Sequence, residues 1–220
     1  MFFLPFSFLI FILLILLLPA LFVLFQIGVI SIAFQKLGMT PTTGFMFFLF
    51  SLIGSAINIP IHEKSYSVPT EIPIPEFYQF WFGIKPKILE KQVIAVNLGG
   101  CILPVLLSLY LLFRAPFFAV LIGTIIMTVV SKILSRPVPG IGIAMPAFIP
   151  PILSAILALI LARENAPAVA YISGVLGVLI GADLLNLSKL TKVGHGVMSI
   201  GGAGVFDGIY LVGIIAVLIA

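Results

Sequence analysis

Two aspartates near the end of the chain are the residues best suited to chemistry. Asp183 lies in an apolar run and Asp207 in a glycine-rich one, and of the seven acidic residues only these two stand outside connecting segments. A carboxyl inside a membrane span costs roughly 2.5–3.5 kcal/mol even on a lenient scale, so a functional role is the default hypothesis. The structural alternative is that a basic side chain, Lys132 or Arg136, neutralises the carboxyl.

The chemistry open to the two aspartates depends on whether they meet. Two adjacent carboxyls share a proton, so that one acts as a base toward water and the other as an acid toward a carbonyl. Lys189 and His195 lie in the turn between the last two predicted spans. In regular helices, Asp183 would lie roughly 9 Å of helical rise before Lys189 and Asp207 roughly 18 Å after His195, so the two aspartates would stand at different depths in the membrane. An unwound segment over residues 194–204, which holds five glycines, would close this gap.

Small-residue pairs in the last two apolar segments provide a second geometric condition. Gly177 and Gly181 form one such pair and Gly204 and Gly208 another, and pairs of this kind allow helices to approach closely. Asp183 projects about 160° from Gly181 around a regular helix. If the two pairs packed against each other, Asp183 would therefore point away from Asp207. A catalytic pair requires the last two helices to meet on another face.

Composition sets the broad class. Sixty-two per cent of the 220 residues are hydrophobic and 8% are charged, against roughly 45–50% apolar and 25% charged in soluble domains. The mean hydropathy is +1.34. We expect one polytopic membrane domain over residues 1–220, embedded in a lipid bilayer. The net charge of +4 arises in connecting segments and does not indicate nucleic-acid binding. No residue spacing suggests a metal site, and no cofactor is expected.

The apolar segments predict an all-α integral membrane protein with about seven transmembrane helices. The second of these segments, residues 42–59, contains small residues that would also suit a re-entrant element. The stretch near 137–151 is too rich in proline and glycine for one helix, so a broken or re-entrant segment is expected there. The predicted spans are a first within 6–33, then 42–59, 93–113, 117–134, a fifth ending near 162, 166–187 and 197–220.

The longest polar connection covers residues about 61–91. Its prolines argue against a continuous helix, and its aromatic cluster at 77–82 favours an interfacial anchor over a substrate-gating lid. With seven crossings, eight basic residues fall on one side and three on the other, namely Lys36, Arg114 and Arg163. The positive-inside rule then predicts a multi-pass protein of the plasma membrane, with the N-terminus, this loop and the turn between the last two spans in the cytoplasm.

Two resemblances rest on the segments around the aspartates. Residues 181–186 and 199–208 resemble a family of prokaryotic polytopic membrane proteins known as domain of unknown function 1614, which implies no established activity. The last two spans are more distantly similar to the presenilin and signal-peptide-peptidase type of intramembrane aspartyl protease. That resemblance implies that Asp183 and Asp207 are a catalytic pair. Ala182 stands where those proteases have a tyrosine, and two residues separate Gly204 from Asp207.

Three functions are compatible with these features. The first is an intramembrane aspartyl hydrolase that cuts a transmembrane peptide. The second is a proton- or cation-coupled transporter or channel for a small solute, in which one aspartate binds the ion. The third is a non-catalytic membrane scaffold. The sequence does not decide whether the protein is an enzyme, and it does not specify an oligomeric state.

The candidate site residues follow from these hypotheses. Asp183 and Asp207 are the candidate catalytic residues. The candidates for contacting a substrate or solute flank the aspartates or interrupt apolar segments, and they are Asn186, Gly202, Gly204, Pro146 and Asn97.

Overall fold

The computed structural model describes residues 15, 17, 24–69, 87–138, 142–187, 196–202 and 208–220. The remaining positions include most of the first predicted span, the aromatic cluster at 77–82 and most of the basic turn at 188–196. They also include Gly204 and Asp207. Predictions for these residues therefore lie outside the described part of the chain.

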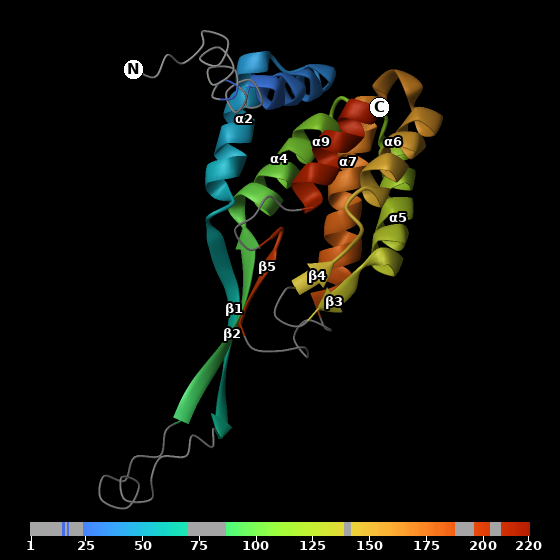
Figure 1. Cartoon of the computed structure of the whole chain (residues 1–220). Helices are drawn as coiled ribbons and strands as arrows, with labels where there is room; N and C mark the ends of the chain where they lie inside the picture. The colour runs from blue at the N-terminus through green and yellow to red at the C-terminus, as the bar shows by residue number, and fades with distance from the viewer. Residues whose placement is uncertain are drawn as a thin grey trace, which may run out of the picture.

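Most of the described chain is helical, and α7 (Ala166–Val178) occupies the centre of the bundle (Figure 1). Ten of its thirteen residues are buried. The helices that pack against it are α4 (Leu103–Leu112), α5 (Phe117–Leu134), α6 (Ile149–Leu161) and α9 (Gly208–Ile219). A central helix that is covered on all sides has no polar face, which explains why the sequence from Ala166 onward is apolar all round.

Among the described residues, two helices are long and apolar enough to cross a membrane, Phe117–Leu134 and Arg163–Asn186, or three if the bent pair described below forms one span. The first is α5, whose bounds coincide with those of the predicted fourth span. Eighteen helical residues rise about 27 Å, close to the roughly 30 Å thickness of a bilayer's hydrocarbon core. A membrane-associated, mostly helical chain is thus supported, while seven spans are not confirmed.

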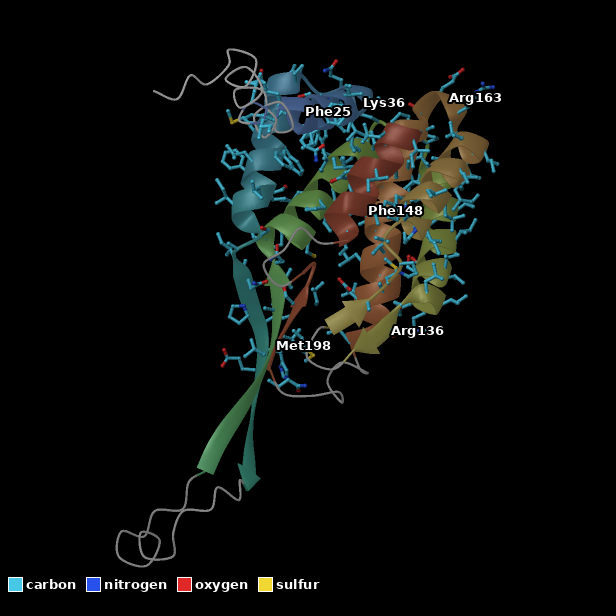
Figure 2. The ribbon with its side chains drawn as sticks, viewed as in Figure 1. Phe25, Lys36, Arg136, Phe148, Arg163 and Met198 are labelled. Carbon is cyan, nitrogen blue, oxygen red and sulfur yellow. The ribbon has the colours of Figure 1, made fainter. Side chains whose placement is uncertain are left out.

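The first two predicted spans meet as a bent pair. Helix Leu24–Lys36 and α2 (Pro41–Gly54) are bent by 113°, which fits either one broken span or a re-entrant element. Thr40 caps α2 by accepting a hydrogen bond from the Thr43 amide, and Pro41 opens the helix, so that α2 begins one residue before the predicted second span. Phe25 and Lys36 lie at the same end of the molecule, so the first helix runs across that end (Figure 2).

A three-stranded sheet adjoins the bundle, in the order β1-β2-β5. Strands β1 (Asn58–Pro69) and β2 (Lys87–Asn97) form an antiparallel hairpin that projects well beyond the helices (Figure 1). Strand β5 (Gly196–Ile200) pairs in parallel with the inner end of β2, from Gln92 to Val96. The described parts of the connection predicted as a loop along the membrane surface, residues 61–69 and 87–91, therefore belong to a projecting hairpin.

The sheet corrects two predicted spans. Residues 93–97 belong to β2, and the helical part of the third segment begins only at π-helix η1 (Leu98–Ile102). Residues 197–200 belong to β5, and α9 begins only at Gly208. Both were predicted as helix because a short apolar run fits a buried strand as well as a helix, and hydropathy does not distinguish them. The end of the predicted second span, residues 58–59, likewise belongs to β1. The chain is mostly helical, but the described residues also contain five strands, so the all-α class is wrong for them.

The predicted interruption before the fifth span is present. Strands β3 (Arg136–Val138) and β4 (Gly142–Ala144) form a small antiparallel pair, and α6 starts only at Ile149. Proline within this stretch removes backbone donors that a continuous helix would need. α6 ends at Leu161, as expected for a segment predicted to end near residue 162.

Basic residues separate to the two ends of the molecule. Lys36 and Arg163 lie at the end reached by the C-terminus of α9, where the Lys36 ammonium donates to the Leu218 carbonyl at 3.0 Å. Arg136 lies at the opposite end, on the side toward which the hairpin projects (Figure 2). These three positions agree with the predicted grouping of basic residues, and the orientation in the membrane stays a prediction.

Glycines allow α7 and its continuation to contact α5 closely. A Cβ atom on Gly177 would lie 2.3 Å from Met127 Cβ, and one on Gly181 would lie 2.3 Å from the Thr128 carbonyl oxygen. By contrast, α7 meets α9 through Gly174, which abuts Val212. The Gly177 and Gly181 pair therefore faces α5, and the interface that would turn Asp183 away from the last segment is not formed.

We expect Gly181→Ala to destabilise the protein by about 1–3 kcal/mol, because the added methyl overlaps a backbone oxygen of α5 and overpacking has costs of this size. The matched control is Gly28→Ala, where a Cβ meets nothing within 4 Å. Denaturant unfolding of both variants in detergent micelles measures the difference. Equal stability of the two variants would contradict the close α5 contact.

Candidate functional site

Asp183 lies where the central helix changes its winding. α7 continues into the π-helix η3 (Leu179–Asp183) and then into the 3-10 turn η4 (Leu184–Asn186). The side chain of Asp183 is partly exposed, and its Oδ2 accepts a hydrogen bond of 3.1 Å from the Gly201 amide. Since backbone N–H groups that point at a carboxylate stabilise its negative form, this contact both orients and binds the carboxyl.

The Gly201 amide is presented by a turn that directly follows β5. Gly201 and Gly202 have φ values of +82° and +93°, a backbone region that side chains rarely permit. A Cβ atom on Gly201 would also lie 2.5 Å from Cys101 Cβ and 2.8 Å from the Cys101 amide nitrogen. Glycine is therefore required at position 201 both by its conformation and by its packing against η1.

Two π-helical segments flank this turn. η3 supplies Asp183, and η1 supplies the surface on which Gly201 packs. π-helical turns are rare and occur frequently at functional sites. The finding that two of them converge on one strand–turn element marks the region as the candidate site.

Asn97 connects the elements on the η1 side of the turn. It is fully buried, and its Oδ1 caps η1 by accepting from the Gly100 amide at 2.7 Å. Its Nδ2 donates to the Ser55 carbonyl at 2.7 Å and to Asn58 Oδ1 at 3.1 Å. Asn58 Oδ1 also accepts from the Ser199 hydroxyl at 2.5 Å. The side chain of Asn97 thus ties the end of α2 and the start of β1 to η1, and Asn58 extends this network to β5.

Asn186 makes the corresponding connection on the η3 side. It is 1% exposed, and its Nδ2 donates to Ser135 Oγ and to the Ala182 carbonyl, each at 2.8 Å. Its Oδ1 accepts from Lys132 Nζ at 2.6 Å, and the same ammonium donates to the Leu185 carbonyl at 2.5 Å. These bonds anchor η3 and η4 to the end of α5, around the residue that carries the carboxyl.

The other predicted site residues are less central in the described chain. Gly202 belongs to the turn after β5, next to the amide that binds Asp183. Pro146 is exposed in the connection between β4 and α6, close in sequence to Phe148, which is 70% exposed (Figure 2). Gly204 and Asp207 lie outside the described residues. Asp183, Gly202 and Asn186 are therefore gathered in one region, and the substrate-binding roles of all five candidates stay predictions.

Metal chemistry has no evident ligand set here. Within the residues that the structure describes, no group of three or more histidine, cysteine, aspartate or glutamate side chains could hold a metal ion. What the described geometry offers is a carboxyl, a backbone donor and a strand–turn element, which together suit proton transfer.

Sequence reasoning missed three contributors to this region. Gly201 was not selected, although two consecutive glycines after an apolar run are a turn signal. Asn58 and Ser199 were not selected either, and they are single polar residues at the edges of apolar runs. Their role depends on the pairing of β1 with β2 and of β2 with β5, which brings together residues 141 positions apart.

We expect Asn97→Ala to lower the free energy of unfolding by about 1–3 kcal/mol, because it removes the partner of the buried Gly100 amide and Ser55 carbonyl. Asn165→Ala is the matched control, since Asn165 is exposed and makes no side-chain cap. Thermal unfolding of the two variants in the same detergent provides the comparison. A loss as small as that of the control would show that the network contributes little.

Comparison with known proteins identifies the family but provides no activity. No curated protein and no solved structure matches the chain. A family model described as "Protein of unknown function (DUF1614)" matches residues 52–219. This match runs from the end of α2 to the end of α9 and includes Asp183 and both π-helical segments. The chain belongs to this family of unknown function.

Proposed function

We propose that the protein is an intramembrane aspartyl hydrolase that cuts a transmembrane peptide, with Asp183 and Asp207 as its acid and base. The observation that carries the proposal is the hydrogen bond of 3.1 Å between the Gly201 amide and Asp183 Oδ2. Gly201 stands six positions before Asp207 in the sequence. The chain segment that leads to Asp207 is therefore anchored at the other carboxyl.

The departure from helix over residues 196–202 also supports the proposal. A continuous helix from residue 197 would separate the two aspartates in depth, whereas a strand and a turn with two left-handed glycines release the chain from helical rise. Asp207 directly precedes Gly208, the first residue of α9, and α9 packs against α7. These features support a close approach of the two aspartates.

In this mechanism the two carboxyls share one proton. One carboxylate takes a proton from a water molecule, which attacks the peptide carbonyl, and the other carboxyl protonates the carbonyl oxygen. The C–N bond of the tetrahedral intermediate then breaks as the first carboxyl gives its proton to the leaving nitrogen and the second takes one back from a hydroxyl of the intermediate. The Gly201 amide orients Asp183 toward the reacting atoms and stabilises its charged form. The similarity of the last two segments to presenilin-type proteases is compatible with these roles.

One observation favours a proton- or cation-coupled transporter instead. The β3–β4 pair interrupts the segment before α6, and broken helices line the binding sites of many transporters. In that case a single aspartate would carry the ion, and the second would be dispensable. The two functions therefore differ in what each aspartate substitution does.

We expect both Asp183→Asn and Asp207→Asn to reduce cleavage of a transmembrane peptide by at least about 10²-fold, the lower range for loss of a general acid or base. The purified protein is reconstituted in liposomes, and cleavage is followed by mass spectrometry of the products. Glu164→Gln is the control, because Glu164 is an exposed acidic residue in η2 on the far side of α7 from η3.

Two results would overturn the hydrolase proposal. One is cleavage that persists in either aspartate variant at the rate of the Glu164→Gln control. The other is solute or proton flux in the same liposomes that one aspartate substitution abolishes while the other leaves it intact.

A further inference from the structure

We propose that Asn186 and Lys132 are positioning residues for Asp183, holding the peptide groups on both sides of it. This inference rests on the proposed function of Asp183 and assigns to Asn186 a role other than substrate contact. Neither side chain is required to touch the substrate. Each acts on the backbone that carries the carboxyl.

The Asn186 side chain fixes the peptide group just before Asp183. Its Nδ2 donates to the Ala182 carbonyl at 2.8 Å, and the amide is 1% exposed. A buried amide with partners on both of its ends is held in one orientation, because losing a partner would leave a polar group unpaired. The carbonyl that precedes Asp183 is thereby held in place.

Lys132 fixes the chain just after Asp183. Its ammonium donates to the Leu185 carbonyl at 2.5 Å and to Asn186 Oδ1 at 2.6 Å. Carbonyls near a helix end have no partner within the helix, and a cation there also interacts favourably with the helix dipole. The Lys132 ammonium on α5 therefore holds the turn η4 directly. It also holds the side-chain amide of Asn186, which in turn binds the Ala182 carbonyl.

The winding of the chain makes this support necessary. η3 and η4 leave the regular α-helical hydrogen-bond pattern on either side of Asp183. Irregular backbone has more alternative conformations than a continuous helix, so external bonds must select one. A displacement of about 1 Å at a catalytic group can cost about 10²-fold in rate. The clamp formed by Lys132 and Asn186 keeps the Asp183 carboxyl within reach of the Gly201 amide.

The test compares substitutions inside one hydrogen-bond network. We expect Asn186→Ala and Lys132→Met to reduce kcat for peptide cleavage by about 10–100-fold with KM essentially unchanged, because positioning affects the reaction more than binding. Ser135→Ala is the matched control, since it removes one partner of Asn186 but leaves the bonds to Ala182 and Lys132. Lys132→Arg restores a donor for both oxygens and should recover most of the lost kcat.

A second readout does not depend on cleavage. Dicyclohexylcarbodiimide modifies protonated carboxyls, and its rate of addition at Asp183 is measured by mass spectrometry in detergent-solubilised full-length protein. Loss of the clamp lets Asp183 move away from the Gly201 amide, so that this hydrogen bond no longer shields the carboxyl from the reagent. Labelling of Asp183 should therefore be several-fold faster in Asn186→Ala and Lys132→Met than in Ser135→Ala or the parent protein.

The two readouts separate the failure of each proposal. Cleavage by the parent protein with kcat unchanged in Asn186→Ala and Lys132→Met would overturn the clamp and leave the hydrolase intact. No cleavage by the parent protein, together with the expected labelling differences, would overturn the hydrolase and support the clamp. Labelling that is equal in all variants would overturn the clamp. If Lys132→Met fails to fold, equal labelling in the parent, Lys132→Arg and Asn186→Ala would overturn it as well.

Discussion

The pairing of β5 with β2 is the interaction on which the rest of the candidate site depends. Non-helical backbone in an apolar layer persists only where its N–H and C=O groups are bonded within the protein. β2 supplies these bonds to β5 on one edge and to β1 on the other, which makes β2 the central strand of the sheet. The pairing with β2 satisfies the backbone groups on one edge of β5, which allows the chain to leave helical geometry at residues 196–200.

This pairing determines where the next turn lies. Because β5 runs parallel to β2 and ends level with Val96, the Gly201–Gly202 turn emerges beside the start of η1. Gly201 is close enough to η1 that a Cβ would overlap Cys101. Its amide then points to Asp183 on η3. Three features thus bring the Asp183 carboxyl and the Gly201–Gly202 turn together. They are the register of β5 against β2, the close contact of Gly201 with η1, and the length of α7.

The sequence predicts the regular helices well and the unwound segments poorly. α5 and the start of α2 at Thr40 and Pro41 follow from an apolar run and from capping chemistry, both of which are local signals. The β-structure at 93–97 and 197–200 is not predictable in this way, since the periodicity of a short apolar run does not distinguish a buried strand from a segment of buried helix. What distinguishes them is pairing between segments about a hundred residues apart, which a single sequence does not reveal.

The same limit applies to the site. Asp183 is recognisable because a carboxyl in an apolar run is costly, and that cost is visible locally. The importance of Gly201 is not visible, because it follows from a positive φ and from a neighbour on a distant element. The direction of the Gly177 and Gly181 pair was equally undetermined, since small residues allow a close approach without specifying which helix approaches.

Different forces hold the two sides of this protein together. Along α7, glycines such as Gly174 and Gly177 allow close van der Waals contact with α9 and α5, a mode of packing that needs no polar groups. Around β5 and η3, two buried asparagines, Asn97 and Asn186, hold the elements through hydrogen bonds. Such networks specify one geometry because each unpaired member would be costly in an apolar environment. Asp183 therefore owes its position to hydrogen-bonded backbone on either side, whereas α7 is held against its neighbours by close glycine contacts and by the buried Ser154 hydroxyl, which donates to the Ala170 carbonyl at 2.6 Å.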